Sequence, residues 1–386
     1  MRFGAALLGV LLIAVNLRVG FVIAGPVIPD ISAEFRWSAS TAGLLTGLPL
    51  ISFAVFSPMA PGLARRFGLD RALVMALLLI AVGILGRSIP VEAAVWIGTV
   101  LIGTGIAFLN VLLPSLVKRD LPLRVGSVTG LYTAAQGAVA AAGAAVVVPL
   151  ANASAYGWRL ALGIWAGLAL IALAILLPKL RSRNRVAATV DGPAGRLRSP
   201  WKSALGWQVT LFMGLQSLAF FVLIAWLPSI ERELGIPAET TGLHTSVFLM
   251  VGVLASLVAG TVMQHASDQR PIALGSSVLA FLAYAGLAIA PQLTLLWVVV
   301  GAVGCGSLIV IALSLFSLRT GNHEQAASLS GMAQSVGYGI AAVGPVVFGA
   351  LRDLTGSWTF PLSAAAALML ALCATAVLSA RNRLIG

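Results

Sequence analysis

The chain is 386 residues long and very apolar: charged residues make up 9% of it, hydrophobic residues make up 59%, and the mean hydropathy is +1.02. A typical soluble domain has about 25% charged residues, so these charges are too few to cover a water-soluble surface. The net charge of +12 does not indicate nucleic-acid binding, because most Lys and Arg lie in short segments between apolar runs rather than on one basic face. The composition therefore excludes a soluble fold and predicts a protein embedded in a lipid bilayer.

Twelve apolar runs follow one another along the chain, which predicts an all-α membrane protein. A hydrocarbon core of about 30 Å requires about 20 helical residues. The first run carries no small-residue cleavage pattern, so we expect a retained helix rather than a removed leader. The predicted spans are residues 5–29, 40–61, 71–90, 94–117, 126–150, 158–178, 205–228, 241–264, 271–290, 293–318, 327–351 and 358–380.

One long polar stretch, residues 179–203, interrupts this series near the middle of the chain and holds seven basic residues. We predict a linker here, between an N-terminal six-helix bundle at 1–178 and a C-terminal six-helix bundle at 204–386. Lys and Arg number 18 on the side of the linker and both termini, against 5 in the alternate loops. Because cytoplasmic loops carry the excess of Lys and Arg, both termini and the linker are expected in the cytoplasm.

The two predicted halves resemble each other. Residues 41–44 (TAGL) recur 199 positions later as 240–243 (TTGL). Residues 103–105 (GTG) and 127–130 (SVTG) recur 201 positions later as 304–306 (GCG) and 328–331 (SLSG). Repeats of this kind are a sequence trace of transporter folds, and two six-helix halves in parallel repeat are the plan of the major facilitator superfamily, which the chain resembles.

The loop between the second and third spans resembles the signature loop of that superfamily. Arg65 stands where the family usually has Asp, so the carboxylate part of the charge pattern is assigned to Asp70. The alternative is a basic loop that only obeys the positive-inside rule. The predicted gating-loop residues are Arg65, Arg66, Gly68, Asp70 and Arg71, with Asp268 and Arg270 at the matching place of the second half.

Arg18 is the one charged residue deep inside a predicted span. An arginine at the bilayer centre costs at least about 2.5–3.5 kcal/mol on insertion scales, so it should face a cavity or a partner rather than lipid. A guanidinium in a midplane cavity suits an anionic, nitro or other electron-rich planar group through two parallel hydrogen bonds. The alternative is an arginine bonded to backbone carbonyls or an Asn, where it would hold helices together.

Acidic residues are expected only in loops and at helix ends, so no buried carboxylate relay is predicted inside a span. His244, near the outer end of the eighth span, is the near-membrane group that titrates around neutral pH. It is a candidate for proton-linked transport or substrate contact. An interfacial hydrogen-bonding histidine is the alternative.

Polar residues at helical spacing mark the spans that line a pore. Thr129, Tyr132, Thr133 and Gln136 share one face of the fifth span, and a second stripe on the eleventh is expected to face it. The alternative is hydrogen bonding between helices, at roughly 0.6 kcal/mol per contact. Besides Arg18 and His244, the predicted substrate-binding residues are Asn110, Tyr132, Thr133, Gln136, Gln216, Ser217, Phe220, Phe221, Gln334, Ser335 and Tyr338.

Within the superfamily, the chain resembles the bacterial cyanate transporter and 2-nitroimidazole transporter family, more strongly on the 2-nitroimidazole side. The resemblance rests on segments that run nearly end to end: 17–19 (LRV), 43–50 (GLLTGLPL), 64–68 (ARRFG), 110–114 (NVLLP), 207–212 (WQVTLF), 226–228 (WLP), 242–244 (GLH) and 329–338 (LSGMAQSVGY). It implies a carrier of the bacterial inner membrane, facilitative or driven by the proton-motive force.

The predicted function is therefore secondary active or facilitative transport of a small planar nitrogen-containing solute by alternating access. The expected partners are this solute, protons as a candidate coupling ion and the lipid bilayer, with the chain acting as a monomer and without a cofactor or metal. One alternative is a broad-specificity proton-coupled drug exporter, although proton antiport usually needs a membrane-embedded acid. An enzyme would require clustered His, Asp or Glu, which the sequence lacks. A non-transporting membrane sensor or binding protein is the other class.

Overall fold

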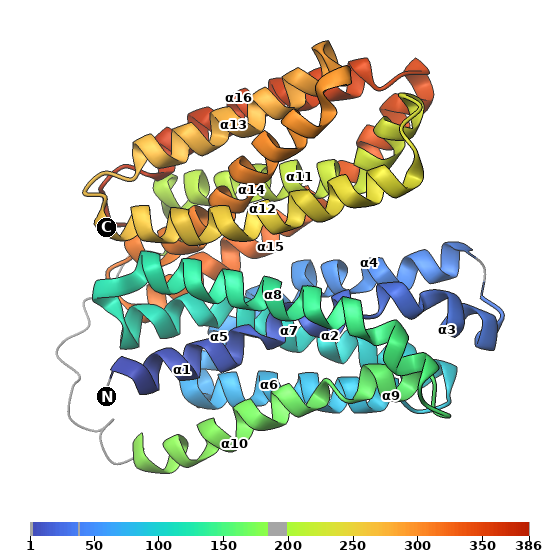
Figure 1. The fold of residues 1–386 in the computed structure, drawn as a ribbon. Helices are drawn as coiled ribbons and strands as arrows, with labels where there is room; N and C mark the ends of the chain where they lie inside the picture. The colour runs from blue at the N-terminus through green and yellow to red at the C-terminus, as the bar shows by residue number, and fades with distance from the viewer. Residues whose placement is uncertain (1–2, 38, 184–198, 386) are drawn as a thin grey trace. The chain divides into compact units, whose positions relative to one another are not determined.

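The computed structural model describes residues 3–37, 39–183 and 199–385 and is built from helices (Figure 1). Within these residues, twelve helical segments are long and apolar enough to cross a membrane. This finding confirms the predicted all-α class with twelve spans. Most of the predicted linker, residues 184–198, lies outside the described residues.

The chain divides into two compact units, and each is described by itself. Unit 1 comprises residues 1–122 and 135–197, and unit 2 comprises residues 123–134 and 198–386, so α8 contributes its first turns to unit 2. The predicted boundaries at 178 and 204 stay a prediction. The helices before the linker are α1 (Phe3–Ala14), α2 (Asn16–Val22), η1 (Gly25–Val27), α3 (Ile28–Phe35), α4 (Ala39–Phe56), η2 (Ser57–Met59), α5 (Ala60–Phe67), α6 (Leu69–Arg87), α7 (Glu92–Asp120), η3 (Pro122–Arg124), α8 (Val125–Asn152), α9 (Trp158–Gly163) and α10 (Ala166–Arg183).

After the linker, the helices follow one another with short connections. They are η4 (Pro200–Lys202), α11 (Ala204–Glu233), α12 (Ala238–His265), α13 (Arg270–Ile289), η5 (Pro291–Leu293), α14 (Thr294–Leu318), α15 (His323–Thr355) and α16 (Thr359–Ser379). In unit 2, α11 packs against α15, α12 against α14, and α13 against both α14 and α16. In unit 1, α7 packs against α6, α4 and α2.

Close glycine contacts join the helices within each unit. In unit 1, a Cβ on Gly105 would lie 2.6 Å from the Ala76 carbonyl oxygen on α6. In unit 2, a Cβ on Gly304 would lie 2.9 Å from the Ser276 carbonyl oxygen on α13. Small residues let helix backbones approach in a membrane, where packing rather than water drives association.

These contacts do not decide the register of the predicted repeat. The sequence pairs Gly103 with Gly304 and Gly105 with Gly306, at an offset of 201. Gly105 and Gly304 each meet the span that precedes their own, whereas Gly103 and Gly306 each meet the span before that, at Ser52 and at Gly252. The 201-residue offset stays a prediction.

The first span, Gly4–Val27, consists of α1 and α2 and passes into the 3-10 helix η1 at Gly25. Val15, between α1 and α2, keeps right-handed helical angles, φ −63° and ψ −19°, and its N–H still donates to the Leu11 carbonyl at 3.0 Å. In the seventh span, α11 continues through Pro228 to Glu233 instead of ending where the predicted span ends at residue 228.

Candidate functional site

Asn16 and Arg18 both lie in α2, near the middle of the first span. Asn16 is fully buried, its Nδ2 donates to the Leu12 carbonyl at 2.8 Å, and its Oδ1 has no hydrogen-bond partner among the described residues. Arg18 is half-buried. Residues two positions apart lie on nearly opposite sides of a helix, so Asn16 faces the bundle while Arg18 lies toward its more open side.

Asn110 on α7 and Arg18 on α2 lie toward the same end of unit 1. Gly20 on α2 packs against Ile102 and Ile106 of α7, where its Cβ would lie 3.0 Å from Ile102. Arg18 lies two residues before Gly20 on α2, and Asn110 lies one turn after Ile106 on α7. Because the two helices run antiparallel, both residues lie on the same side of the Gly20 contact, toward the same end of unit 1. Asn110 is half-buried, and Gln136, also in unit 1, is 5% exposed.

In unit 2, the predicted binding residues of α11 are engaged with each other. Gln216 Nε2 donates to Ser217 Oγ at 2.7 Å and to the Met213 carbonyl at 3.2 Å, and both side chains are buried. Phe220 packs edge-on against Phe221, with ring centroids 5.4 Å apart. These contacts are compatible with side chains that only stabilise the helix packing as well as with side chains that bind the solute. Substrate contact at these residues stays a prediction.

The two polar stripes are both present as helix faces. Tyr132 of α8 is buried, and its hydroxyl is hydrogen-bonded to Thr129. Thr133 is 6% exposed, and its hydroxyl has no hydrogen-bond partner among the described residues. On α15, Gln334 is fully buried and its Nε2 donates to Ser330 Oγ at 2.8 Å, while Ser335 and Tyr338 are half-buried.

His244 lies against a buried acid on the neighbouring helix. Its Nδ1 is 2.6 Å from Glu231 Oε1, and the Glu231 side chain is 0% exposed. Glu231 is in the last turn of α11, so it lies at a helix end, as expected for the acidic residues. Its burial was not predicted, because the helix continues past Pro228 instead of ending there.

In unit 1, Asp70 lies in the first turn of α6 and is paired with Arg119 in the last turn of α7. Arg119 binds both Asp70 oxygens, at 2.7 and 3.0 Å, and its Nε also donates to Asp120 at 2.8 Å. Arg65, Arg66 and Arg71 remain exposed. Gly68, between α5 and α6, has φ 85° and ψ 151°, a conformation that requires glycine. The gating role of this loop stays a prediction.

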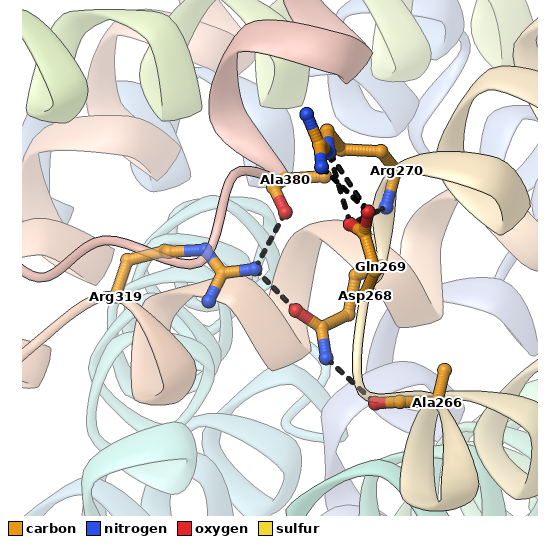
Figure 2. A network of polar contacts seen from close by, with 6 residues as sticks. All are labelled: Ala266, Asp268, Gln269, Arg270, Arg319 and Ala380. Carbon is orange, nitrogen blue, oxygen red and sulfur yellow. Dashed lines mark hydrogen bonds and ion pairs between the residues drawn. The ribbon is translucent and has the colours of Figure 1, made fainter.

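The matching loop of unit 2 forms the network in Figure 2. Asp268 accepts from Arg270 at 2.9 Å, and these hydrogen bonds lower the pKa of the exposed Asp268 carboxyl. The buried Arg319 Nη2 binds Gln269 Oε1 and also donates to the Ala380 carbonyl at 2.8 Å. Arg319 thereby ties the end of α14 to the carboxyl end of α16 and to the turn before α13.

Sequence reasoning missed several polar residues that the structure buries. They include Asn16, Glu231 and Arg87; Arg87, the last residue of α6, is 1% exposed, and its Nε and Nη2 have no hydrogen-bond partner among the described residues. The pairing of the half-buried Arg119 was also missed. One signal was available: a basic residue directly after a long apolar run ends the last helical turn and can be drawn into the bundle.

The helices and buried polar groups define a class: a polytopic membrane protein with polar residues held inside its helical units. A family model for the Major Facilitator Superfamily matches residues 10–345 and 209–384. The chain belongs to the major facilitator superfamily, a family of transporters, and its relatives and fold are not those of enzymes.

Three curated relatives place the chain within the superfamily. It is 41% identical to the uncharacterized transporter YycB of Bacillus subtilis, over 98% of this chain and 94% of that protein. It is 40% identical to the 2-nitroimidazole transporter of Escherichia coli, over 97% and 95%. The cyanate transport protein CynX of Escherichia coli is 28% identical, over 91% of each. These relatives confirm the predicted resemblance to the cyanate and 2-nitroimidazole transporters.

Solved structures share the fold at low sequence identity. The proton:xylose symporter XylE matches with a TM-score of 0.76 and 14% identity, covering 96% of this chain and 94% of that one. The transporter FucP, in the outward conformation, matches with a TM-score of 0.76 and 14% identity over 97% and 98%. These likenesses confirm the fold.

Proposed function

We propose that this chain is a secondary active or facilitative transporter that moves a small planar nitrogen-containing solute, cyanate-like or 2-nitroimidazole-like, across a bacterial inner membrane by alternating access. The solute is held near mid-membrane by Arg18 and by the polar faces of α8 and α15. The chain works as a monomer with both termini in the cytoplasm, as the charge bias favours.

Arg18 carries this proposal. A guanidinium in the first span costs at least about 2.5–3.5 kcal/mol to insert, and a membrane protein keeps such a group where it faces a cavity, pathway or partner. Arg18 lies near the middle of the helical span Gly4–Val27. Transporters of this kind hold their solute near the middle of the membrane.

The chemistry of the guanidinium supports the solute class. Its planar fork donates two parallel hydrogen bonds, which match the paired oxygens of a nitro group or the charge of a small anion. Asn110, half-buried on α7 of the same unit, supplies an amide. The names of two relatives, the 2-nitroimidazole transporter and the cyanate transport protein, point to the same class.

The test is solute uptake into proteoliposomes with Arg18→Gln, Arg18→Lys and the exposed Arg383→Gln as a matched control. Hydrogen bonds to charged groups are worth about 1.5–3 kcal/mol, or roughly ten- to hundredfold in affinity. We expect Arg18→Gln to weaken uptake of 2-nitroimidazole or cyanate by at least tenfold, Arg18→Lys to recover part of it, and the control to match the wild type. Uptake by Arg18→Gln equal to the wild type, with equal reconstitution, would overturn the assignment.

A broad-specificity proton-coupled exporter is the second candidate, and the buried Glu231 favours it. Proton antiport in the membrane usually uses an embedded acid. Competition experiments separate the two candidates: a selective carrier is inhibited only by small planar nitrogen compounds, whereas a broad exporter is also inhibited by large lipophilic cations.

A further inference from the structure

We propose that Glu231 and His244 together form a proton-binding site, and that protonation of this site is coupled to transport. The coupling part rests on the proposed function, whereas the proton-binding part does not. The pair lies in unit 2, where α11 ends and α12 begins, which is the outer end in the predicted topology.

The geometry of the carboxylate is the first argument. Glu231 Oε1 lies 2.6 Å from His244 Nδ1, whereas Oε2 is buried and has no hydrogen-bond partner among the described residues. An ionised carboxylate accepts at both oxygens, and a buried charge with unfilled acceptor positions is very costly. A proton on the pair removes that charge or balances it.

The surroundings of the pair supply little other compensation. Glu231 is in the last turn of α11, where the helix dipole repels a carboxylate and attracts a positive charge. The next two residues, Arg232 and Glu233, are exposed, and Glu233 is paired with Arg352 of α15 at 3.2 Å. Asp353 is also exposed on α15, 3.9 Å from Arg352.

Few other titratable groups belong to this end of unit 2. The sequence of α12 includes one further acidic residue near this end, Glu239, whose side chain lies outside the described residues. The sequences of α14 and α16 hold no charged residue, and the one in α13, Arg270, is at its other end. Among the described side chains, His244 is therefore the titratable group that contacts Glu231.

A path for the proton follows from the exposure of the two partners. The Glu231 side chain is 0% exposed and that of His244 is 14% exposed, so the imidazole is the member that water reaches. When the ring takes a proton at Nε2 and releases the one at Nδ1 to the carboxylate, the imidazole is neutral again and Glu231 has become a carboxylic acid. The proton count is conserved, and no other reactant is needed.

The internal repeat separates this pair from the structural ion pairs. At the 199-residue offset, Glu34 matches Glu233, and each binds an arginine of its own unit, Arg159 and Arg352. At the same offset, Glu231 matches Ser32 and His244 matches Leu45. Both halves therefore have the surface ion pair, but only the second has the buried acid and histidine, so the buried pair is not a requirement of the fold.

The first experiment measures proton binding directly. The chain has three histidines, so ¹⁵N signals of labelled histidine in the purified full-length protein can be assigned with single variants. We expect Glu231→Gln to change the proton concentration at which His244 is half-titrated by at least threefold. Glu233→Gln, the matched control two residues away, should leave it unchanged. A His244 titration that is the same in Glu231→Gln and the wild type overturns the proposal.

The second experiment measures coupling, in proteoliposomes with an imposed pH gradient and 2-nitroimidazole or cyanate as the probe. We expect Glu231→Gln to lose gradient-driven accumulation at least tenfold while keeping solute exchange without a gradient, and Glu233→Gln to match the wild type in both. Retained exchange shows that Glu231→Gln is folded. Gradient-driven accumulation equal to the wild type in Glu231→Gln overturns the coupling. If the wild type carries neither probe, the proposed function fails, and the histidine titration alone decides the proton site.

Discussion

Two glycines that touch each other in unit 2 should respond to alanine in opposite ways. Gly306 on α14 packs directly on Gly252 of α12, and a Cβ on Gly306 would lie 2.6 Å from the Gly252 Cα and against its carbonyl oxygen. A Cβ on Gly252 instead points to ordinary contacts, 3.7 Å from the Ala302 oxygen and 3.9 Å from the Gly306 Cα. Ser256 Oγ spans the same crossing and donates to the Gly306 carbonyl at 2.9 Å.

The expected magnitudes follow from these distances. Carbon atoms rest about 3.5–4.0 Å apart, so Gly306→Ala must separate the two helices by about 1 Å. Overpacking of this kind costs about 1–3 kcal/mol, and stretching the Ser256 hydrogen bond adds roughly 0.6 kcal/mol. Gly252→Ala needs no movement and removes a helix-interior glycine, which is worth about 0.5–1 kcal/mol.

The assay is thermal unfolding of the purified protein in one detergent, with the wild type and both variants compared at the same scan rate because unfolding is expected to be irreversible. We expect Gly306→Ala to lower the unfolding midpoint by several degrees and Gly252→Ala to leave it equal or raise it. Equal midpoints for the two variants, or a lower one for Gly252→Ala, would refute the packing argument.

Three further outcomes can be checked on the same preparation. Gly68→Ala, which forces a side chain into φ 85°, should cost about 1–3 kcal/mol and lower the unfolding midpoint, whereas Gly62→Ala, which meets open space, should not. Arg319→Met should lower the midpoint and increase hydrogen exchange at the carboxyl end of α16, because the last carbonyls of that helix lose their donor. In the wild type, hydrogen bonds from Arg159 lower the pKa of Glu34, so the ion pair stabilises the fold at neutral pH and stops doing so as the pH falls through that pKa. The stability difference between Arg159→Gln and the wild type should therefore be largest near neutral pH and vanish in acid; a difference that persists at low pH would contradict it.

Hydropathy predicted the number and order of the spans because a bilayer imposes a minimum apolar length on each. It placed Arg18 inside the first span for the same reason. It could not show that Asn16, two residues before Arg18, is fully buried. That burial depends on the packing of α2 against α7.

The end of α11 shows why polar residues at a span boundary are difficult to assign. Pro228 and the polar residues after it favour a helix end. The helix nevertheless continues through Pro228, as helices inside a bundle can, and carries Glu231 to His244. Two residues separated by 13 positions on two different helices meet only in three dimensions, so their pairing was beyond a single sequence. The partner of Asp70 was hidden for the same reason, since Arg119 is 49 positions away.

The two surface ion pairs, Glu34 with Arg159 and Glu233 with Arg352, also bear on how the two halves evolved. A chain built by duplication of one six-helix unit begins with two identical sets of helix ends, so a feature that both halves share can be as old as the duplication. The Glu231–His244 pair occurs in one half, whereas Ser32 and Leu45 occupy the matching positions in the other. Glu34 and Glu233 match across the repeat, whereas Trp358 and Ala153 occupy the positions that match Arg159 and Arg352. The two halves therefore share the glutamate, and each pairs it with an arginine from a different position.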